Sequence, residues 1–299
     1  MSESAGRGLR GLTGRAGRRR AWFGLLTLLG LDRGFFIPCR TAGEAPPPGT
    51  RLPYAAVEER LAAREEAFRD VLELCAGYAA DLRRIGEAPP PEPRWDQGWF
   101  PRLDAAVAYS FLRKLAPARV VEVGSGHSTR FLRRAVVDGS LATRITAIDP
   151  EPRADIGASG NGNGAASVSL LRCSVQAAGE APFQDLAAGD VLLIDSSHVL
   201  MPGSDVDFLL GRVLPRLPAG VHVQLHDVFL PDDYPADWDW RGYNEQLGVA
   251  ALLSGGGWDV AFASHYVSSR MTMDLAASPL ARLPLMPGSH ESSLWLVKQ

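Results

Sequence analysis

Residues 119–130, Arg-Val-Val-Glu-Val-Gly-Ser-Gly-His-Ser-Thr-Arg, decide the fold of this chain. The valines between Val120 and Val123 are β-branched and apolar, which is typical of a strand buried on both faces of a parallel sheet. Gly124 and Gly126 end the strand and let the backbone come close to a ligand. The stretch therefore predicts a strand that leads directly into a ligand-binding turn.

A helix is expected after this turn. Ser128 or Thr129 can cap it through a side-chain oxygen, and apolar residues follow at helical spacing from Phe131 to Val137. The free N–H groups at the start of such a helix suit a carboxylate or a phosphate. Glycine-rich turns occur in dinucleotide-binding and in purely structural positions, so neighbouring residues have to indicate the ligand.

An acidic residue ends the next apolar strand. Residues 144–149 read Arg-Ile-Thr-Ala-Ile-Asp, and an acid at Asp149 can accept hydrogen bonds from two ribose hydroxyls. The turn over residues 122–128 lacks the third glycine that lets a helix approach a pyrophosphate. It resembles the first motif of class I S-adenosylmethionine-dependent methyltransferases. The resemblance implies that S-adenosylmethionine is the cofactor and that six residues bind it: Glu122, Gly124, Ser125, Gly126, Asp149 and Asp195.

The composition is that of a globular protein. With 299 residues, 46% hydrophobic and 22% charged, the chain can hold one large α/β domain with an extension, and disordered, fibrous and multi-span membrane classes are excluded. Cys39, Cys75 and Cys173 are widely spaced and form no Cys-x-x-Cys pair. This usage favours a reducing compartment, so a cytoplasmic protein is expected.

The first 45 residues are expected to form a basic, flexible tail. Residues 1–20 hold six arginines and one glutamate, a net charge of +5, so the remainder of a chain with net charge −3 carries −8. A mildly acidic folded part disfavours nucleic acid as a partner. The apolar run 21–31 is well short of the roughly 20 residues of a membrane span, and Asp32 follows it where a signal peptide needs a cleavage site. Two uses stay open: peripheral contact with a membrane surface, or a docking segment on a disordered tail.

Residues 46–100 are predicted to form a helical extension ahead of a methyltransferase domain over residues 101–299. Apolar residues between Tyr54 and Ile85 recur at intervals of three, four or seven, which predicts one long helix. Its apolar stripe is expected to pack against the catalytic domain or against a second subunit of a homo-oligomer.

Two aromatic residues, Trp99 and Phe100, precede the first helix of the predicted domain. In methyltransferases such a segment commonly covers the cofactor and the acceptor, so these side chains either form part of a lid or simply pack. The helix itself is expected over residues 104–115, with Asp104 as its N-cap.

Apolar strands and helical segments alternate from Arg119 onward, which predicts an α/β fold with a doubly wound, Rossmann-like sheet. A helix is expected over residues 205–217 and a flexible surface loop over the glycine- and asparagine-rich run 157–164. The resemblance implies that the last two strands form an antiparallel pair, which completes seven strands. The expected strand cores are Val120–Val123, Ile145–Ile148, Val168–Leu171, Val191–Ile194, Val221–Leu225, Val260–Ala263 and Leu294–Val297.

Acidic and imidazole side chains follow two neighbouring strands. Asp195-Ser-Ser-His198 comes after the fourth strand, and His226-Asp227 after the fifth. Ligands of open α/β sheets bind beyond the carboxyl ends of the strands, so these groups are expected in one crevice. A single aspartate there can merely cap a helix, and a single histidine can hydrogen-bond a loop. Because each of the two strand ends carries both an aspartate and a histidine, a functional site is favoured.

The order Asp-x-x-His, then Leu-Pro-x-Leu-Pro-Ala-Gly over residues 214–220, then His-Asp resembles a branch of these methyltransferases that acts mostly on small-molecule hydroxyls, including those of sugars. The resemblance implies that His198 is the catalytic base and that Asp195, His226 and Asp227 bind a Mg or Mn ion. An imidazole, with an ordinary pKa of about 6.5, suits removal of a hydroxyl proton near neutrality. Because His226 stands where related enzymes often have a carboxylate, metal dependence is left open.

Two other functions stay open. A nicotinamide-dependent oxidoreductase is disfavoured by the missing third glycine, the terminal strand pair and the lack of a Tyr-x-x-x-Lys pair. A non-catalytic adenosyl-binding or scaffold module would use the long N-terminal helix as its working surface. Methylation of nucleic acids or of protein nitrogens is disfavoured, because no Asn-Pro-Pro-Tyr motif is present. The acceptor molecule itself has no signature in the sequence.

Overall fold

The computed structural model describes residues 15–31, 34–35, 39–156 and 167–299. The run 157–164, predicted to be a surface loop, lies outside the described residues. The chain divides into two compact units, one formed by Met1–Leu52 with Asp232–Tyr243 and the other by Pro53–Pro231 with Asn244–Gln299. The domain boundaries expected from the sequence stay predictions.

The smaller unit has one α-helix among its described residues, α2 (Arg15–Leu28), and two 3₁₀ helices, η1 (Ala42–Glu44) and η5 (Ala236–Arg241). The Arg51 guanidinium donates to both carboxylate oxygens of Asp233, at 3.1 and 3.0 Å, and so ties the two segments of this unit together. Within the part of the chain that the structure describes, no helix has the length and apolar character needed to cross a membrane. Contact with a membrane surface stays a prediction.

The larger unit begins with three helices, α3 (Ala55–Ala62), α4 (Glu65–Gly77) and α5 (Ala79–Arg84). The prediction of one long helix is therefore wrong. The backbone leaves the helical region at Arg64 (φ −109°, ψ 4°) and at Tyr78 (φ −103°, ψ 11°), which separates the three pieces. Most of the apolar stripe is nevertheless buried in the core of the unit, because each piece can turn its own apolar side inward, whereas Tyr54 at its start is exposed.

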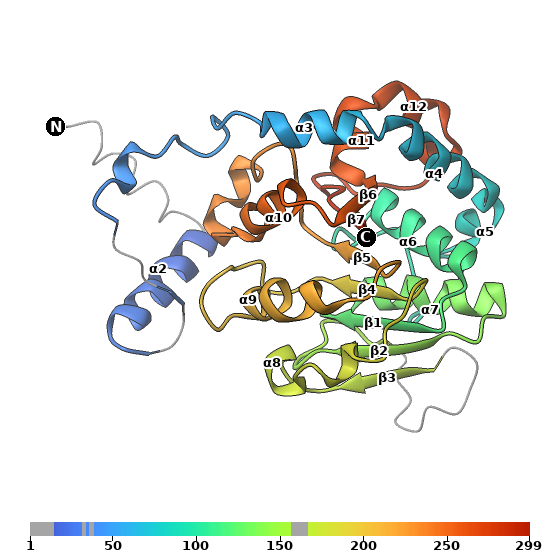
Figure 1. The fold of residues 1–299 in the computed structure, drawn as a ribbon, viewed down its shortest axis with the longest axis horizontal. Coiled ribbons are helices and arrows are strands. Elements are labelled where there is room, and N and C mark those ends of the chain that lie inside the picture. The colour runs from blue at the N-terminus through green and yellow to red at the C-terminus, as the bar shows by residue number, and fades with distance from the viewer. Residues whose placement is uncertain (1–14, 32–33, 36–38, 157–166) are drawn as a thin grey trace. The chain divides into compact units, whose positions relative to one another are not determined.

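The larger unit is built on a seven-stranded sheet of order β3-β2-β1-β4-β5-β7-β6 (Figure 1). β1 to β5 run parallel, and β7 is antiparallel to both β5 and β6. The predicted doubly wound sheet and its terminal antiparallel pair are confirmed. The strands are β1 (Arg119–Val123), β2 (Arg144–Ile148), β3 (Val168–Leu171), β4 (Val191–Ile194), β5 (His222–Leu225), β6 (Trp258–Ala263) and β7 (Leu294–Lys298).

The register brings several strand ends to one edge of the sheet. Val123 pairs with Ile148 of β2 and with Ile194 of β4, and Ile194 pairs with Leu225 of β5. Since these strands are parallel, the residues that directly follow them emerge side by side. The chemistry-bearing residues predicted at the strand ends therefore meet at this edge.

Helices cover both faces of the sheet, with α9 on one side and α6 and α7 on the other in Figure 1. The helix predicted over residues 205–217 is confirmed as a helical segment, although it changes from α to π to 3₁₀ geometry along its length. The elements are α6 (Arg102–Leu115), α7 (His127–Gly139), α8 (Val175–Ala178), η2 (Ala181–Phe183), α9 (Asp205–Phe208), η3 (Leu209–Val213), η4 (Leu214–Arg216), α10 (Glu245–Ser254), α11 (Ser264–Arg270), α12 (Thr272–Ala277) and η6 (Pro279–Arg282).

Asp104 does not cap α6, which corrects the sequence prediction. The N-cap residue is Pro101, and Asp104 lies in the first turn with no exposed surface. Its carboxylate accepts hydrogen bonds from the backbone N–H groups of Ser292, at 3.0 Å, and Ser293, at 2.9 Å. Asp104 thus joins the start of α6 to the segment that enters β7, next to the crevice at the strand ends.

Candidate active site

The turn after β1 is built around the side chain of Glu122. The N-cap residue of α7 is Gly126, so neither predicted cap occupies that position, although Thr129 at the third helical position accepts the Gly126 N–H as a capping side chain does. Both hydroxyls donate to the Glu122 carboxylate, Ser128 at 2.5 Å and Thr129 at 2.6 Å. The Gly126 N–H donates in turn to the Thr129 hydroxyl oxygen at 3.0 Å. These bonds fix the turn on a carboxylate that lies beneath it.

Glu122 is only 1% exposed. Burial raises its pKa to about 8, although the two hydroxyl donors lower it. Glu122 lines neither of the two cavities at this edge of the sheet, so it supports the turn rather than facing a ligand. Its predicted contact with the cofactor stays a prediction.

The larger cavity, of about 320 Å³, lies at the ends of β1, β2 and β4. Its lining includes Gly124, Ser125, Asp149 and Asp195, four of the six residues predicted to bind the cofactor. The Asp149 carboxylate accepts hydrogen bonds from the Ser125 backbone N–H at 2.7 Å and from its hydroxyl at 3.0 Å. Asp149 therefore holds the glycine turn in place and also faces the cavity.

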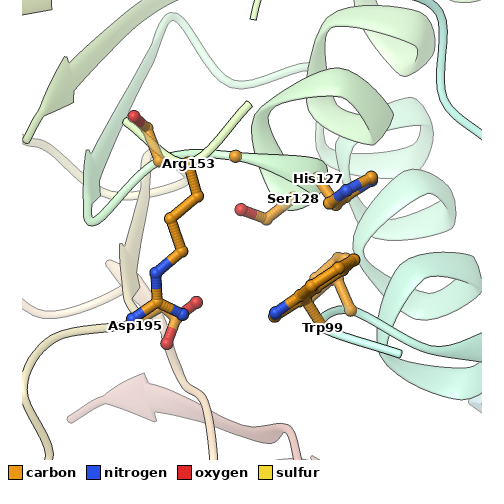
Figure 2. A pocket seen from close by; sticks show the side chains of 8 residues that line it. Trp99, His127, Ser128, Arg153 and Asp195 are labelled. Atoms are coloured by element: carbon orange, nitrogen blue, oxygen red, sulfur yellow. The ribbon is translucent and has the colours of Figure 1, made fainter. Parts of the chain in front are cut away.

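A smaller cavity of about 60 Å³ adjoins the larger one (Figure 2). Gly126, also predicted to bind the cofactor, lines it together with Trp99. The Trp99 indole is 57% exposed and stacks on the His127 imidazole, with ring centroids 5.2 Å apart and ring planes within 3° of parallel. Arg153 and Asp195 line both cavities, so the two spaces adjoin at these side chains.

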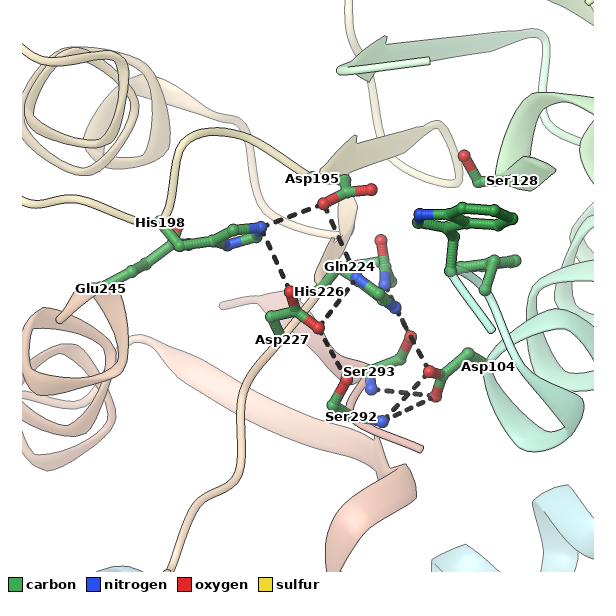
Figure 3. Close-up of polar contacts among 12 residues, drawn as sticks. Asp104, Ser128, Asp195, His198, Gln224, His226, Asp227, Glu245, Ser292 and Ser293 are labelled. Carbon is green, nitrogen blue, oxygen red and sulfur yellow. Dashed lines mark hydrogen bonds and ion pairs between the residues drawn. The ribbon is translucent and has the colours of Figure 1, made fainter. Parts of the chain in front are cut away.

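The groups predicted at the ends of β4 and β5 form one cluster (Figure 3). The His198 Nε2 lies 3.1 Å from the Asp195 carboxylate and 3.5 Å from that of Asp227. Its Nδ1 lies 2.8 Å from the Glu245 carboxylate. His198 and Asp227 both have left-handed backbone, with φ of 60° and 54°. Such strained residues persist where the surrounding structure holds them, often at functional sites.

A second imidazole faces the same carboxylates. The His226 Nδ1 lies 3.6 Å from Asp195 and 3.4 Å from Asp227, and its Nε2 lies 3.3 Å from Asp104. The ring is 4% exposed, and neither nitrogen makes a hydrogen bond of normal geometry among the described residues. His226 is therefore a buried polar side chain directed at the two carboxylates without being satisfied by them.

The electrostatics of the cluster couple its carboxylates to its imidazoles. Burial alone would lower the pKa of His198, but hydrogen bonds to Asp195 and Glu245 raise it well above its usual range. Burial would likewise lower the pKa of His226, but the charges of Asp227 and Asp195 raise it well above its usual range. Although burial would raise it, the charge of the His226 imidazole holds the pKa of Asp195 below its ordinary value. A cationic group among these carboxylates is strongly favoured.

The donor set of this cluster fits a divalent cation. Ligand atoms of Asp195, His198 and Asp227 lie within 4.8 Å of one another. Two carboxylates and an imidazole are ordinary donors for ions such as Mn²⁺. The group contains two of the three predicted ligands together with the predicted base. The third predicted ligand, His226, lies outside it and contacts the same carboxylates from another side.

Sequence reasoning missed two residues of the cluster. Glu245 begins α10 and is far from the strand-end motifs in the sequence, and no spacing or motif connects it to His198. Asp104 was assigned only a capping role, although it supports His226. The structure also places the predicted base differently from the expectation: His198 is 2% exposed and lines neither cavity, whereas the Asp195 side chain is 38% exposed and lines both.

Comparison with known proteins agrees with this architecture. Residues 121–228 match a family described as a methyltransferase domain. This segment runs from β1 to just beyond β5 and contains every predicted site residue. No curated protein matches the chain in sequence.

Several solved structures are similar to the chain. The methyltransferase PaMTH1 of Podospora anserina bound to SAH has 18% identity and a TM-score of 0.41, with 84% of this chain and 99% of that chain covered. An O-methyltransferase of Bacillus cereus in complex with SAH has 10% identity and a TM-score of 0.40, with 77% and 91% covered. The O-methyltransferase TomG of Streptomyces achromogenes in complex with SAM has 14% identity and a TM-score of 0.38, with 75% and 89% covered.

The sheet order, the cavity at the glycine turn and the matched segment support one assignment. In open α/β sheets the ligand lies beyond the carboxyl ends of the strands, where both cavities are found. The terminal antiparallel pair distinguishes this sheet from an all-parallel dinucleotide-binding fold. Residues 121–228 are similar to a family of methyltransferase domains, and the sheet around them has the predicted order with a terminal antiparallel pair.

Proposed function

We propose that this protein transfers a methyl group from S-adenosylmethionine to a hydroxyl group of a small molecule such as a sugar or a secondary metabolite. The observation that carries the proposal is the position of Asp195, which lines both cavities and is backed by His198 and Asp227. A cofactor in one cavity and an acceptor in the other would meet at this carboxylate.

The cofactor is proposed to occupy the larger cavity. The Asp149 Oδ2 accepts both hydrogen bonds from Ser125, and Oδ1 accepts one from the Glu151 N–H at 2.8 Å, so Oδ1 keeps a lone pair that can accept from a ribose hydroxyl. At Gly124 and Gly126 the turn would approach the cofactor with backbone only, and the sulfonium end of the cofactor would point toward Asp195. A carboxylate at that position favours the positive charge of the sulfonium.

His198, in the neutral form that it takes above its raised pKa, is proposed as the final acceptor of the hydroxyl proton. Transfer to an alcohol requires that the O–H bond breaks as the methyl group moves in line from sulfur to oxygen. Because His198 is buried behind Asp195, the proton would pass from the hydroxyl to the Asp195 carboxylate and from there, over 3.1 Å, to the imidazole Nε2. Holding the two reactants in line supplies the rest of the rate enhancement.

A divalent ion is a second use of the same atoms, favoured by the close approach of their ligand atoms. Asp195, Asp227 and an imidazole, His198 or His226, would hold it. Such an ion lowers the pKa of a hydroxyl and orients it. An ion on the His198 Nε2 would occupy the lone pair that a base needs, so the two uses exclude each other at that atom.

The proposal is tested by following the methyl group. The protein is incubated with methyl-labelled S-adenosylmethionine and a metabolite extract, with and without chelator, and the labelled products are identified by mass spectrometry. We expect a labelled methyl ether, and His198→Ala is expected to lower its yield by a factor of about 10² to 10⁴. A product labelled on nitrogen would contradict O-methylation, and full activity of His198→Ala would contradict the base.

A further inference from the structure

The first turn of α10 holds the backbone of His198. The His198 carbonyl oxygen accepts hydrogen bonds from the backbone N–H groups of Asn244, at 3.0 Å, and Glu245, at 3.2 Å. The Asn244 side chain holds the next part of the same loop, because its Oδ1 accepts from the Leu200 N–H at 2.6 Å and its Nδ2 donates to the Leu200 carbonyl at 3.3 Å. The loop after β4 is thereby fixed to α10 on both sides of Val199.

The left-handed backbone of His198 needs such support. A residue with a side chain at φ 60° is strained, and it stays there only when its surroundings hold it. The two backbone hydrogen bonds from α10 provide this constraint. They also set the direction in which the side chain leaves the loop.

The side chain of Glu245 also holds the imidazole ring of His198. Its Oε2 lies 2.8 Å from the His198 Nδ1, and both side chains are almost completely buried. The other oxygen, Oε1, has no hydrogen-bond partner among the described residues, so contact with His198 is the polar interaction that this carboxylate makes. Glu245 also stands at the N-terminus of a helix, where the helix dipole favours a negative charge.

A carboxylate can only accept a hydrogen bond, so this contact places a proton on the His198 Nδ1. The Nε2 faces the Asp195 and Asp227 carboxylates (Figure 3), so it carries a second proton while the ring is charged and is the nitrogen without a proton once the ring is neutral. A carboxylate behind an imidazole is the usual device for fixing its tautomer and orientation, both for a base and for a metal ligand.

We propose that Glu245 is the positioning residue of the site: it fixes the His198 imidazole in the Nδ1–H tautomer and directs Nε2 at Asp195 and Asp227. The tautomer itself does not depend on the proposed function; only its effect on catalysis does. It holds whether Nε2 takes a proton or binds an ion. A purely structural Glu245 would stabilise α10 without determining which nitrogen of His198 carries the proton.

The tautomer is measured by nitrogen NMR on the full chain labelled with ¹⁵N-histidine, at a pH above the raised pKa of His198 where the ring is neutral, with the His198 signals identified by their loss in His198→Gln. We expect a protonated Nδ1 with a slowly exchanging proton in the wild type. In Glu245→Ala we expect that proton to exchange fast and the ring to populate both tautomers. Gln246→Ala is the matched control, because it removes a buried polar contact, to the Phe229 N–H, from the same helix. It should leave the His198 signals unchanged.

Two results would overturn the proposal. One is a wild-type His198 whose Nδ1 carries no proton, and the other is a Glu245→Ala protein with unchanged His198 signals. If Glu245→Ala fails to fold, Glu245→Gln serves instead, because its amide keeps the shape and replaces the charged acceptor. Affinity for S-adenosylhomocysteine is measured in parallel and should be the same in all these variants. Absence of that affinity in the wild type would refute the proposed function while leaving the tautomer result valid.

Discussion

The backbone carbonyl oxygen of Asp195 lies 1.9 Å from the point that a Cβ atom on Gly124 would occupy. No side chain can exist at that distance. Glycine at this position therefore lets the turn after β1 approach the end of β4, which brings the cofactor cavity and Asp195 together.

This close approach predicts that Gly124→Ala lowers the free energy of unfolding by more than the strain of its left-handed backbone alone. Gly256 is a matched control, since its φ of 80° equals the 79° of Gly124 but nothing lies within 4 Å of its added Cβ. Both substitutions introduce the strain of a left-handed alanine, about 1–2 kcal/mol. Gly124→Ala is expected to lose about 1–3 kcal/mol more, as overpacked sites do. Equal losses in urea unfolding would show that the close approach has no energetic consequence.

The raised pKa of Glu122 predicts that the free energy of unfolding falls as the pH rises. Its pKa is about 8 in the folded chain against an ordinary value of 4.5, so between these values the folded state holds a proton that the unfolded state has released. The free energy of unfolding then decreases with rising pH across that window. Glu122→Gln removes this slope and should gain on the order of 3 kcal/mol relative to the wild type between pH 5 and pH 8.

The measurement is urea unfolding of both proteins at pH 5 and pH 8 in the same salt. Titration of the other buried groups affects both proteins alike, so the difference between them isolates Glu122. A difference that is the same at the two pH values would contradict the raised pKa.

Metal binding is predicted to favour Mn²⁺ over Mg²⁺. The donors include an imidazole whichever histidine takes part, whereas Mg²⁺ prefers oxygen ligands only. After treatment with chelator, Mn²⁺ should raise the melting temperature more than Mg²⁺ does, and Asp227→Asn should abolish the shift. At a hundredfold excess over Kd, the stabilisation is about 2.7 kcal/mol. Asp259→Asn, an exposed residue of β6, is the control. A shift that survives in Asp227→Asn would place the ion elsewhere, and no shift at all would leave the metal-free mechanism.

Removal of residues 1–45 is predicted to leave cofactor affinity within about twofold of the full chain, a change below the ~1 kcal/mol cost of one lost hydrogen bond. The described residues that line the larger cavity all belong to the larger unit. Calorimetry with S-adenosylhomocysteine on both chains checks this, with melting temperature as a control for folding. If the truncated chain loses its affinity or melts far lower, the segment from Trp22 to Phe36 contributes to the folded core.

Strand positions and sheet topology were predictable because they follow from local residue type. Buried parallel strands such as Val120–Val123 are continuous apolar runs, and the alternation of strands and helices restricts the sheet order. Helix ends were less predictable. Asp104 has a good capping side chain but uses it in hydrogen bonds to the segment before β7, and the Thr129 hydroxyl bonds both the Gly126 N–H and the Glu122 carboxylate. The long N-terminal helix was wrong for a related reason, since its apolar period does not show where the backbone turns at Arg64 and Tyr78.

Some residues of the candidate site could likewise be predicted from the sequence, and others could not. Asp195, His198, His226 and Asp227 could be predicted because each lies within a few residues of a strand end that the sheet brings together. Glu245 could not, because it reaches His198 from a helix after the fifth strand and only the folded chain makes the contact. The burial of His198 behind Asp195 could not be predicted either, since it depends on the path of the loop after β4.

The claim that the larger cavity binds S-adenosylmethionine through Asp149 is tested most directly by calorimetric titration of S-adenosylhomocysteine into the wild type and Asp149→Ala. Asp185→Ala, which removes an exposed carboxylate that does not line the cavity, is the control, and NAD is the control ligand. We predict one site in the wild type, affinity weakened by about 1–3 kcal/mol in a folded Asp149→Ala protein, and no change in Asp185→Ala. Binding of NAD in place of S-adenosylhomocysteine, or undiminished affinity in Asp149→Ala, would contradict the account.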